Sequence, residues 1–181
     1  MKTLSPYLVA VEYSLAMGNF NEQIVKQYFE LKGYYLQSDV KFPVPRNYSD
    51  IDLIGFSSGG KPVIVEVKGW HTTSVGKALG VGEIDAFLKN ERMWKKAEAY
   101  LGKSRTEFEK VNVFSELGKD SREAVKKHDK ANGVDVLEFP EILVYLFKNT
   151  ETGPEPSSEV LQMVRVIKQF GKTIIGVLKK E

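Results

Sequence analysis

Residues 48–68 read YSDIDLIGFSSGGKPVIVEVK, and this stretch decides the fold class. Two runs rich in aliphatic residues, 50–56 and 62–70, flank a Ser-Ser-Gly-Gly turn signal at residues 57–60. Such runs around such a turn predict a β-hairpin. Both runs are apolar on either face, as in strands at the centre of a sheet that is covered on both sides.

The predicted hairpin brings charged side chains together. With the three-residue loop Ser-Gly-Gly, Ser57 lies opposite Lys61, and counting back along both strands places Asp52 opposite Glu66. Side chains of directly paired residues leave the same face of a sheet, with Cβ atoms about 4.5–5.5 Å apart. Lys68 shares the face of Glu66 because side chains alternate along a strand. We therefore expect two carboxylates and an ammonium group on one patch.

Charges at such positions are rarely buried unless they are paired or bound to a metal. Two carboxylates opposite each other repel, and a divalent cation is the simplest way to hold them together. The alternative is a solvated charged face, since the same acid-x-Lys pattern recurs at residues 30–32 and 39–41. Strict alternation would put Asp50 on the same face of the strand as Asp52, Ile54 and Phe56. The face of the strand therefore does not indicate which of the two aspartates joins Glu66 and Lys68. Asp52 is favoured for this role because the predicted register puts it next to Glu66.

The rest of the chain alternates between helix and strand signals. The predicted elements are a helix over 20–32 that stops at Gly33, a strand over 34–42, the hairpin, a helix over 83–102, a strand over 111–114, a helix over 121–131, a strand over 134–139, a helix over 141–148 and an amphipathic helix over 160–174. Hairpin strands followed by a β–α–β unit predict an α/β fold with a mixed sheet flanked by helices.

Composition narrows the function. The chain has 181 residues, of which 42% are hydrophobic and 28% charged, so it can bury a real core. The absence of cysteine excludes disulfides, thiolate nucleophiles and Cys-ligated metals. A net charge of +2 permits a polyanionic partner. No apolar run approaches the roughly 20 residues of a membrane span, so we expect a cytoplasmic, intracellular protein without a membrane partner.

Residues 48–54 (YSDIDLI) and 63–68 (VIVEVK) together resemble the PD-(D/E)xK signature of the restriction-endonuclease-like superfamily, which includes archaeal Holliday junction resolvases and Mrr-type endonucleases. The predicted element order matches the αβββαβ core of that superfamily, over about residues 18–140. One departure is that no proline precedes Asp50 or Asp52, which leaves open which of the two is the ligand.

The resemblance implies a metal-dependent DNA endonuclease that uses Mg²⁺ or Mn²⁺. Asp52 and Glu66 would hold the metal together with the backbone carbonyl of Val67. Lys68 would orient or help deprotonate the attacking water and stabilise the pentavalent phosphate. The first helix of the superfamily often supplies another acid, here Glu22, which could reach the metal directly or through water. The alternative for Glu22 is an acid favoured by the helix dipole.

The resemblance also implies DNA, duplex or branched, as the partner. Basic residues that could neutralise its phosphates lie in the predicted helix 83–102: Lys89, Arg92, Lys95 and Lys96. Trp70 could stack on a base or pack under the loop, and His71 could touch phosphate or be incidental. RNA is a further possible substrate, since the sequence does not specify the sugar.

The predicted domain organisation is a nuclease-like domain at 1–149, a linker at 150–158 and an amphipathic helical segment at 159–181. Cleavage of both strands would favour a homodimer, with the apolar faces of 142–147 and 160–174 as candidate interfaces. The alternative function is a catalytically inactive nuclease fold that binds nucleic acid or assembles a complex.

Overall fold

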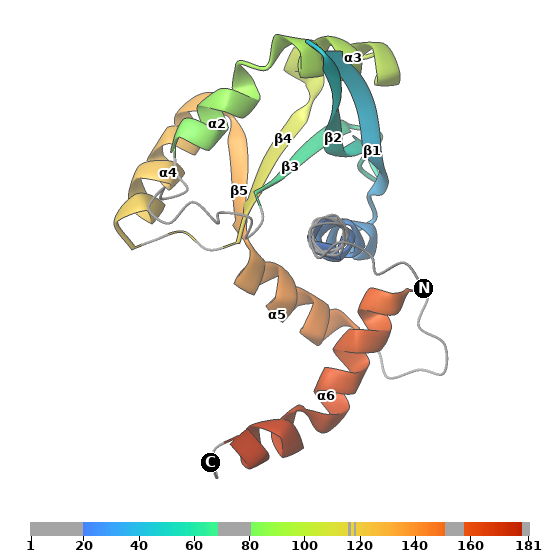
Figure 1. Ribbon diagram of the computed structural model, residues 1–181, viewed down its shortest axis with the longest axis vertical. Helices are drawn as coiled ribbons and strands as arrows, with labels where there is room; N and C mark the ends of the chain where they lie inside the picture. The colour runs from blue at the N-terminus through green and yellow to red at the C-terminus, as the bar shows by residue number, and fades with distance from the viewer. Residues whose placement is uncertain (1–19, 69–80, 116, 118, 151–157, 179–181) are drawn as a thin grey trace, which may run out of the picture.

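The computed structural model describes residues 20–68, 81–115, 117, 119–150 and 158–178, and its centre is a mixed β-sheet (Figure 1). The five strands are neighbours in chain order: β1 (Tyr35–Val44), β2 (Asn47–Phe56), β3 (Pro62–Lys68), β4 (Glu109–Phe114) and β5 (Val134–Glu138). β1, β2 and β3 pair antiparallel, whereas β3, β4 and β5 pair parallel.

Helices cover both faces of this sheet. They are an unlabelled helix over residues 20–31 (blue in Figure 1), α2 (Val81–Leu88), α3 (Glu91–Leu101), α4 (Lys119–Asn132), α5 (Phe139–Asn149) and α6 (Glu159–Leu178), with a 3-10 turn η1 at Arg105–Glu107. The fold is therefore α/β, with a mixed sheet between helices and with C-terminal helices. This confirms the predicted fold class and the predicted order of the strands.

The apolar core is divided by the sheet. On one side, helix 20–31, α5 and α6 bury residues such as Val25, Ile142 and Val160 against Leu53 and Val65 of the sheet. On the other side, α2 and α3 contribute two clusters that contain the buried side chains of Phe87, Met93 and Trp94 in one and Ile84 in the other. Strands β2 and β3 supply apolar side chains to both sides, which is why both sequence runs are apolar throughout.

The first helix ends where the sequence predicts, whereas the first two strands are longer than predicted. The helix stops as expected at Gly33, whose φ of 83° is a left-handed conformation that glycine adopts without strain. Strand β1 continues through Pro43 to Val44, and Pro45 and Arg46 form a two-residue turn into β2 at Asn47. The expected end of β1 before Pro43 was wrong, because a proline is tolerated in an edge strand.

The prediction of a single long helix over residues 83–102 was also wrong. The chain forms two helices, α2 and α3, and α3 begins at Asn90, whose side chain accepts a hydrogen bond from the N–H of Met93 at 3.2 Å. The Trp94 indole N–H donates to the carbonyl of Phe87 at 3.2 Å, so the two helices are tied together at the break. An asparagine cap that interrupts a helical pattern is difficult to distinguish from a surface position in a longer helix.

The C-terminal helix α6 runs away from the sheet in Figure 1 after packing on α5 near its start. Its bounds agree with the helical segment predicted at 159–181, while residues 151–157 of the predicted linker and residues 1–19 lie outside the described residues. The proposed division into domains stays a prediction. Among the helices of the described ranges, none is long and apolar enough to cross a membrane.

Candidate active site

The β2–β3 hairpin adopts the predicted register. Leu53 pairs with Val65 and Phe56 pairs with Pro62, and the backbone N–H of Ser57 donates to the carbonyl of Lys61 at 2.9 Å. The pairing ends at Leu53 and Val65, and Asp52 and Glu66 are the next residues along the two strands. The turn predicted from the sequence therefore brings these two acids to the same level of the sheet.

Strict alternation along β2 does not hold. Ile51 and Ile54 pack in the same apolar cluster although they are three residues apart, while Leu53 packs on the opposite side of the sheet. Asp39 of β1, which the register aligns with Asp52, has a φ of 56° and marks an irregularity in the neighbouring strand. The expectation that the residues from Asp50 to Phe56 share faces by simple alternation was therefore wrong at this level of the sheet.

Asp52 is held against the backbone of β3. Its Oδ2 atom accepts a hydrogen bond of 2.6 Å from the N–H of Val67, the residue between Glu66 and Lys68. Burial, and next the carboxylate of Glu66, raise the pKa of Asp52 to about 8. The Val67 N–H and the Lys68 ammonium act in the opposite direction because they stabilise the charged form. Asp52 is thus a buried acid beside a second acid.

Glu66 and Lys68 contact each other directly. The Lys68 ammonium donates to Oε1 of Glu66, and the Glu66 side chain is only 16% exposed. This contact follows from their spacing of two residues on one strand, which puts both side chains on the same face. The two acids and the lysine predicted for the site are therefore brought together by β2 and β3.

Glu22 lies at the edge of this group, on helix 20–31. Its Oε2 atom is buried without a hydrogen-bond partner among the described residues. Burial, followed by the carboxylates of Asp39 and Asp50, raises the pKa of Glu22 to about 7, and Glu66 adds a smaller effect. The helix therefore directs an acid towards the same negative region, and this burial argues against a merely solvated residue at a helix terminus.

Asp50 differs from Asp52 in its surroundings. It pairs with Lys41 across β1 and β2, and its Oδ2 accepts from the Lys41 ammonium at 2.6 Å. Both side chains of this ion pair are largely exposed. Asp50 therefore has a partner on the surface, whereas Asp52 lies beside Glu66 and Val67.

The donor set fits a hard divalent cation. Across residues 20–68, 81–115, 117, 119–150 and 158–178, no group of three His, Cys, Asp or Glu side chains could hold a metal by itself. Mg²⁺ does not need such a cage, because it keeps several waters and is commonly bound by one or two carboxylates and substrate phosphate. Asp52 and Glu66 offer two carboxylates, and their mutual repulsion is the unfavourable energy that a cation would relieve.

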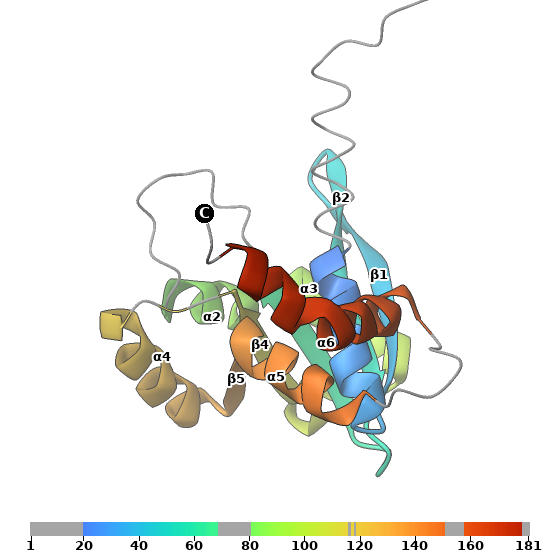
Figure 2. The same ribbon diagram turned by 90° about the horizontal axis from the view of Figure 1, so that it is seen from below.

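The predicted phosphate-binding residues lie on α3 and in the turn that precedes it. Arg92, Lys95 and Lys96 of α3 line a groove of about 580 Å³ together with Pro43 and Pro45 of the β1–β2 turn. Figure 2 shows this hairpin projecting from the body of the protein. Lys89 lies outside α3 and forms an ion pair of 2.8 Å with Asp85. Trp70 and His71 lie outside the described residues.

The structure adds one residue that the sequence did not single out. Asn112 of β4 is fully buried, and the register pairs it with Glu66. The signal available in the sequence was an amide within the apolar stretch VNVF at residues 111–114.

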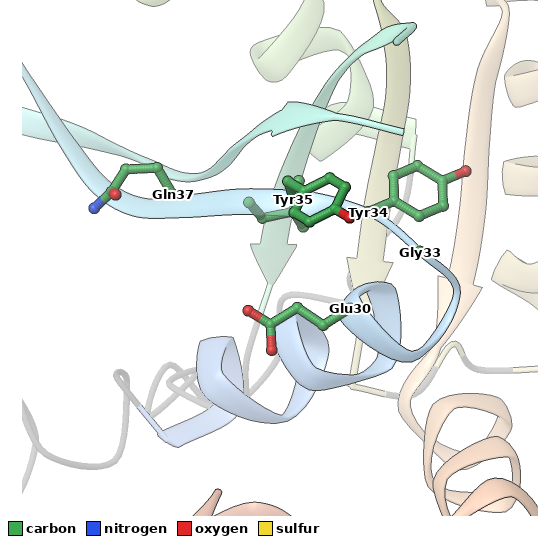
Figure 3. Close-up of a pocket in the computed structure, with 6 residues that line it drawn as sticks. Glu30, Gly33, Tyr34, Tyr35 and Gln37 are labelled. Atoms are coloured by element: carbon green, nitrogen blue, oxygen red, sulfur yellow. The ribbon is translucent and has the colours of Figure 1, made fainter. Parts of the chain in front are cut away.

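A separate hollow of about 570 Å³ lies between helix 20–31 and the edge strand β1. Figure 3 shows Glu30 from the helix and Tyr35 and Gln37 from the strand along it. Among the described residues that line it, Glu30 is the only one with a carboxylate, and Asp52, Glu66 and Lys68 are not among them. This hollow is distinct from the candidate active site.

No protein-family model and no curated protein matches this sequence. Among solved structures, a protein of unknown function is similar, with a TM-score of 0.50 and 17% identity over 72% of this chain and 66% of that chain. A repair endonuclease from Pyrococcus abyssi has a TM-score of 0.39 and 14% identity over 77% of this chain. This chain covers 48% of that enzyme, about half its length. At such identities the likeness concerns the fold, and function has to be argued from the site.

Proposed function

We propose that this protein is a metal-dependent endonuclease that hydrolyses phosphodiester bonds in DNA. The observation that carries the proposal is the hydrogen bond from the Val67 N–H to Asp52, because it fixes one buried acid beside the strand that bears Glu66 and Lys68. An acid whose pKa burial raises to about 8, beside a second carboxylate and an ammonium, is unfavourable for folding alone and favours a functional explanation.

Asp52 and Glu66 would hold Mg²⁺ or Mn²⁺, with the carbonyl of Val67 as a further oxygen ligand. When bound, the cation supplies an activated water and neutralises charge on the phosphate. The hydrogen bond from the Val67 N–H leaves the second carboxylate oxygen of Asp52, Oδ1, available for the metal. Glu22 would contribute through a water, because its carboxylate approaches from the helix at the edge of the site.

Lys68 would act on the substrate. In the structure its ammonium contacts Glu66, so it lies within reach of a phosphate held at the two acids. A positive charge placed there stabilises the additional negative charge of the pentavalent phosphate and orients the attacking water. Binding of a cation at Glu66 weakens the attraction between that acid and Lys68, which favours transfer of the ammonium to the phosphate.

The groove between α3 and the β1–β2 turn would bind the DNA backbone. Three cations line one wall, and the prolines offer an apolar surface that suits sugars. Counting along β1 from Asp39, at the level of Asp52, to Pro45 gives six residues, or about 20 Å. Phosphate contacts there would position the duplex without reading its sequence.

A homodimer would give the two active sites that double-strand cleavage needs. Part of each predicted interface is internal, because Ile142, Leu146, Val160 and Val164 pack within the protomer. Among the α6 side chains whose burial the structure describes, the exposed apolar ones are Val166, Ile167 and Phe170. Phe170 lies four residues after Val166 and three after Ile167, so the three form one stripe along the helix. This stripe is the dimer surface we propose.

The experiment is nicking of supercoiled plasmid with Mn²⁺, comparing the wild type with Asp52→Asn and Asp50→Asn. The two variants make the same chemical change two residues apart. We expect the nicking rate of D52N to fall more than about a hundredfold. Loss of a residue that only orients a metal ligand typically costs 10–100-fold, and loss of the ligand itself should cost more. D50N should stay within a few-fold, since Asp50 has Lys41 as its partner.

If D52N and D50N lose the same fraction of the nicking rate, the assignment of Asp52 as the metal ligand is wrong. An inactive wild type on plasmid, branched and single-stranded DNA that still binds DNA would favour the alternative, an inactive nuclease fold that acts as a binding subunit. Activity that is confined to RNA would change the substrate but leave the site in place.

A further inference from the structure

Asn112 lies within β4 and is completely buried. Neither Oδ1 nor Nδ2 of its side chain has a hydrogen-bond partner within the described part of the chain. A buried polar group left unpaired destabilises the folded state, and most such groups in proteins are paired. An aliphatic residue like its neighbours Val111 and Val113 would avoid this penalty. Packing alone therefore does not explain the amide.

The register of the sheet indicates what the amide faces. In the parallel pairing of β3 and β4, Asn112 is the partner of Glu66, and neighbouring strands are about 4.8 Å apart. On its other side Asn112 pairs with Val136 of β5, which is apolar. Across the sheet, Glu66 is thus the polar neighbour that the register brings to Asn112.

In the structure, Glu66 is contacted by Lys68 and not by the amide of Asn112. Oε1 of Glu66 receives its hydrogen bond from Lys68. A cation bound at Glu66 weakens the attraction between this acid and Lys68, so Glu66 loses a donor while it must keep its orientation towards the cation. The amide group of Asn112 has two N–H donors and no charge, so it can replace Lys68 without competing with a cation for the carboxylate.

We infer that Asn112 is a positioning residue that holds the Glu66 carboxylate for metal binding by donating a hydrogen bond from Nδ2. This inference rests on the proposed function, because it assumes that Glu66 is a metal ligand. Such outer partners orient a ligand, and their removal typically weakens metal affinity 10–100-fold.

The test is Mn²⁺ binding to the full chain, without DNA, followed by the loss of the free-ion signal in electron paramagnetic resonance. Asn112→Thr and Asn112→Val form a matched pair, since the two side chains have nearly the same shape and only threonine has a donor. We expect N112V to bind Mn²⁺ about tenfold more weakly than N112T. A second pair, N112S and N112A, repeats the comparison with smaller side chains in case the first pair packs poorly.

Equal Mn²⁺ affinities within both pairs would overturn the inference. Thr150→Val is the remote control, because Thr150 is a buried threonine whose hydroxyl donates to the carbonyl of Leu146 at 2.6 Å. It should leave Mn²⁺ affinity unchanged. Asp52→Asn tests the metal site separately from the role of Asn112. If D52N binds Mn²⁺ as tightly as the wild type, the proposed metal site is wrong. If D52N loses binding while N112V and N112T agree, only the role of Asn112 fails.

Discussion

The backbone N–H of Val67 donates a hydrogen bond of 2.6 Å to the carboxylate of Asp52, across the β2–β3 hairpin. This contact joins the two strands at the level where the acids gather, one step beyond the last paired residues of the ladder. It also holds Asp52 close to Glu66, whose charge contributes to the raised pKa of Asp52. The same surroundings of Asp52 make the stability of the protein depend on pH.

Without metal, the stability of the folded protein should fall as pH rises. The pKa of Asp52 is about 8 in the folded protein, against about 3.9 for an unperturbed aspartate. The folded state therefore binds the proton more tightly, and the stability gained from this proton is complete below pH 4 and lost as pH rises through 8. In EDTA, Asp52→Asn should melt at a higher temperature than the wild type at pH 8.5, and the difference should shrink at pH 5.

Asp135→Asn is the control for this measurement, because it makes the same change at an exposed position of β5. It should leave the pH dependence unaltered. Adding Mn²⁺ at pH 8.5 should reverse the order of Asp52→Asn and the wild type, since a ligand that binds the folded state stabilises it. A wild-type melting temperature that rises between pH 5 and 8.5 in EDTA would contradict the prediction.

The α3 groove predicts how DNA binding depends on salt. Each phosphate contact contributes about −0.9 to the slope of log affinity against log salt concentration for duplex DNA. Replacing Arg92 and Lys95 together by alanine should therefore weaken binding of a duplex and make the slope about 1.8 units less negative. Fluorescence anisotropy in EDTA, across a range of salt concentrations, measures both quantities without cleavage.

Lys148→Ala serves as the matched control for the groove. Lys148 is exposed on α5, which packs on the opposite side of the sheet from α3. Its loss should leave the slope near that of the wild type. A slope that is the same in the groove variant and the wild type would show that the α3 cations do not contact the DNA backbone.

The exposed stripe on α6 predicts the effect of a charge on assembly. Phe170 is 48% exposed and Val166 is 53% exposed in the single chain. If they meet the same stripe of a second copy, Phe170→Glu would bury like charges near the two-fold axis and dissociate the dimer. Sedimentation velocity should find a dimer for the wild type and a monomer for F170E. Gln169→Glu, which adds the same charge at the next position of the helix, should remain dimeric; a monomeric wild type would refute this interface.

Much of the fold could be predicted because it depends on local patterns. The turn at residues 57–60 fixed the register of the hairpin, and the period of apolar residues identified the helices. The break at Asn90 was missed because an asparagine that caps a helix looks the same in the sequence as one on the surface of a longer helix. The extension of β1 through Pro43 was missed because whether a strand lies at the edge of a sheet depends on the whole topology.

In the candidate site, too, some features follow from local sequence and others only from tertiary packing. By itself, the sequence determined which acids could meet, because a turn of known length sets a register in which Asp52 is level with Glu66. Only the tertiary structure decided the surroundings of those acids: the irregularity opposite Asp39, the buried approach of Glu22 from a helix and the unpaired amide of Asn112. Register is a short-range property of the chain. Burial and electrostatic coupling arise between segments that are distant in the sequence, so they become defined only when the helices pack on the sheet.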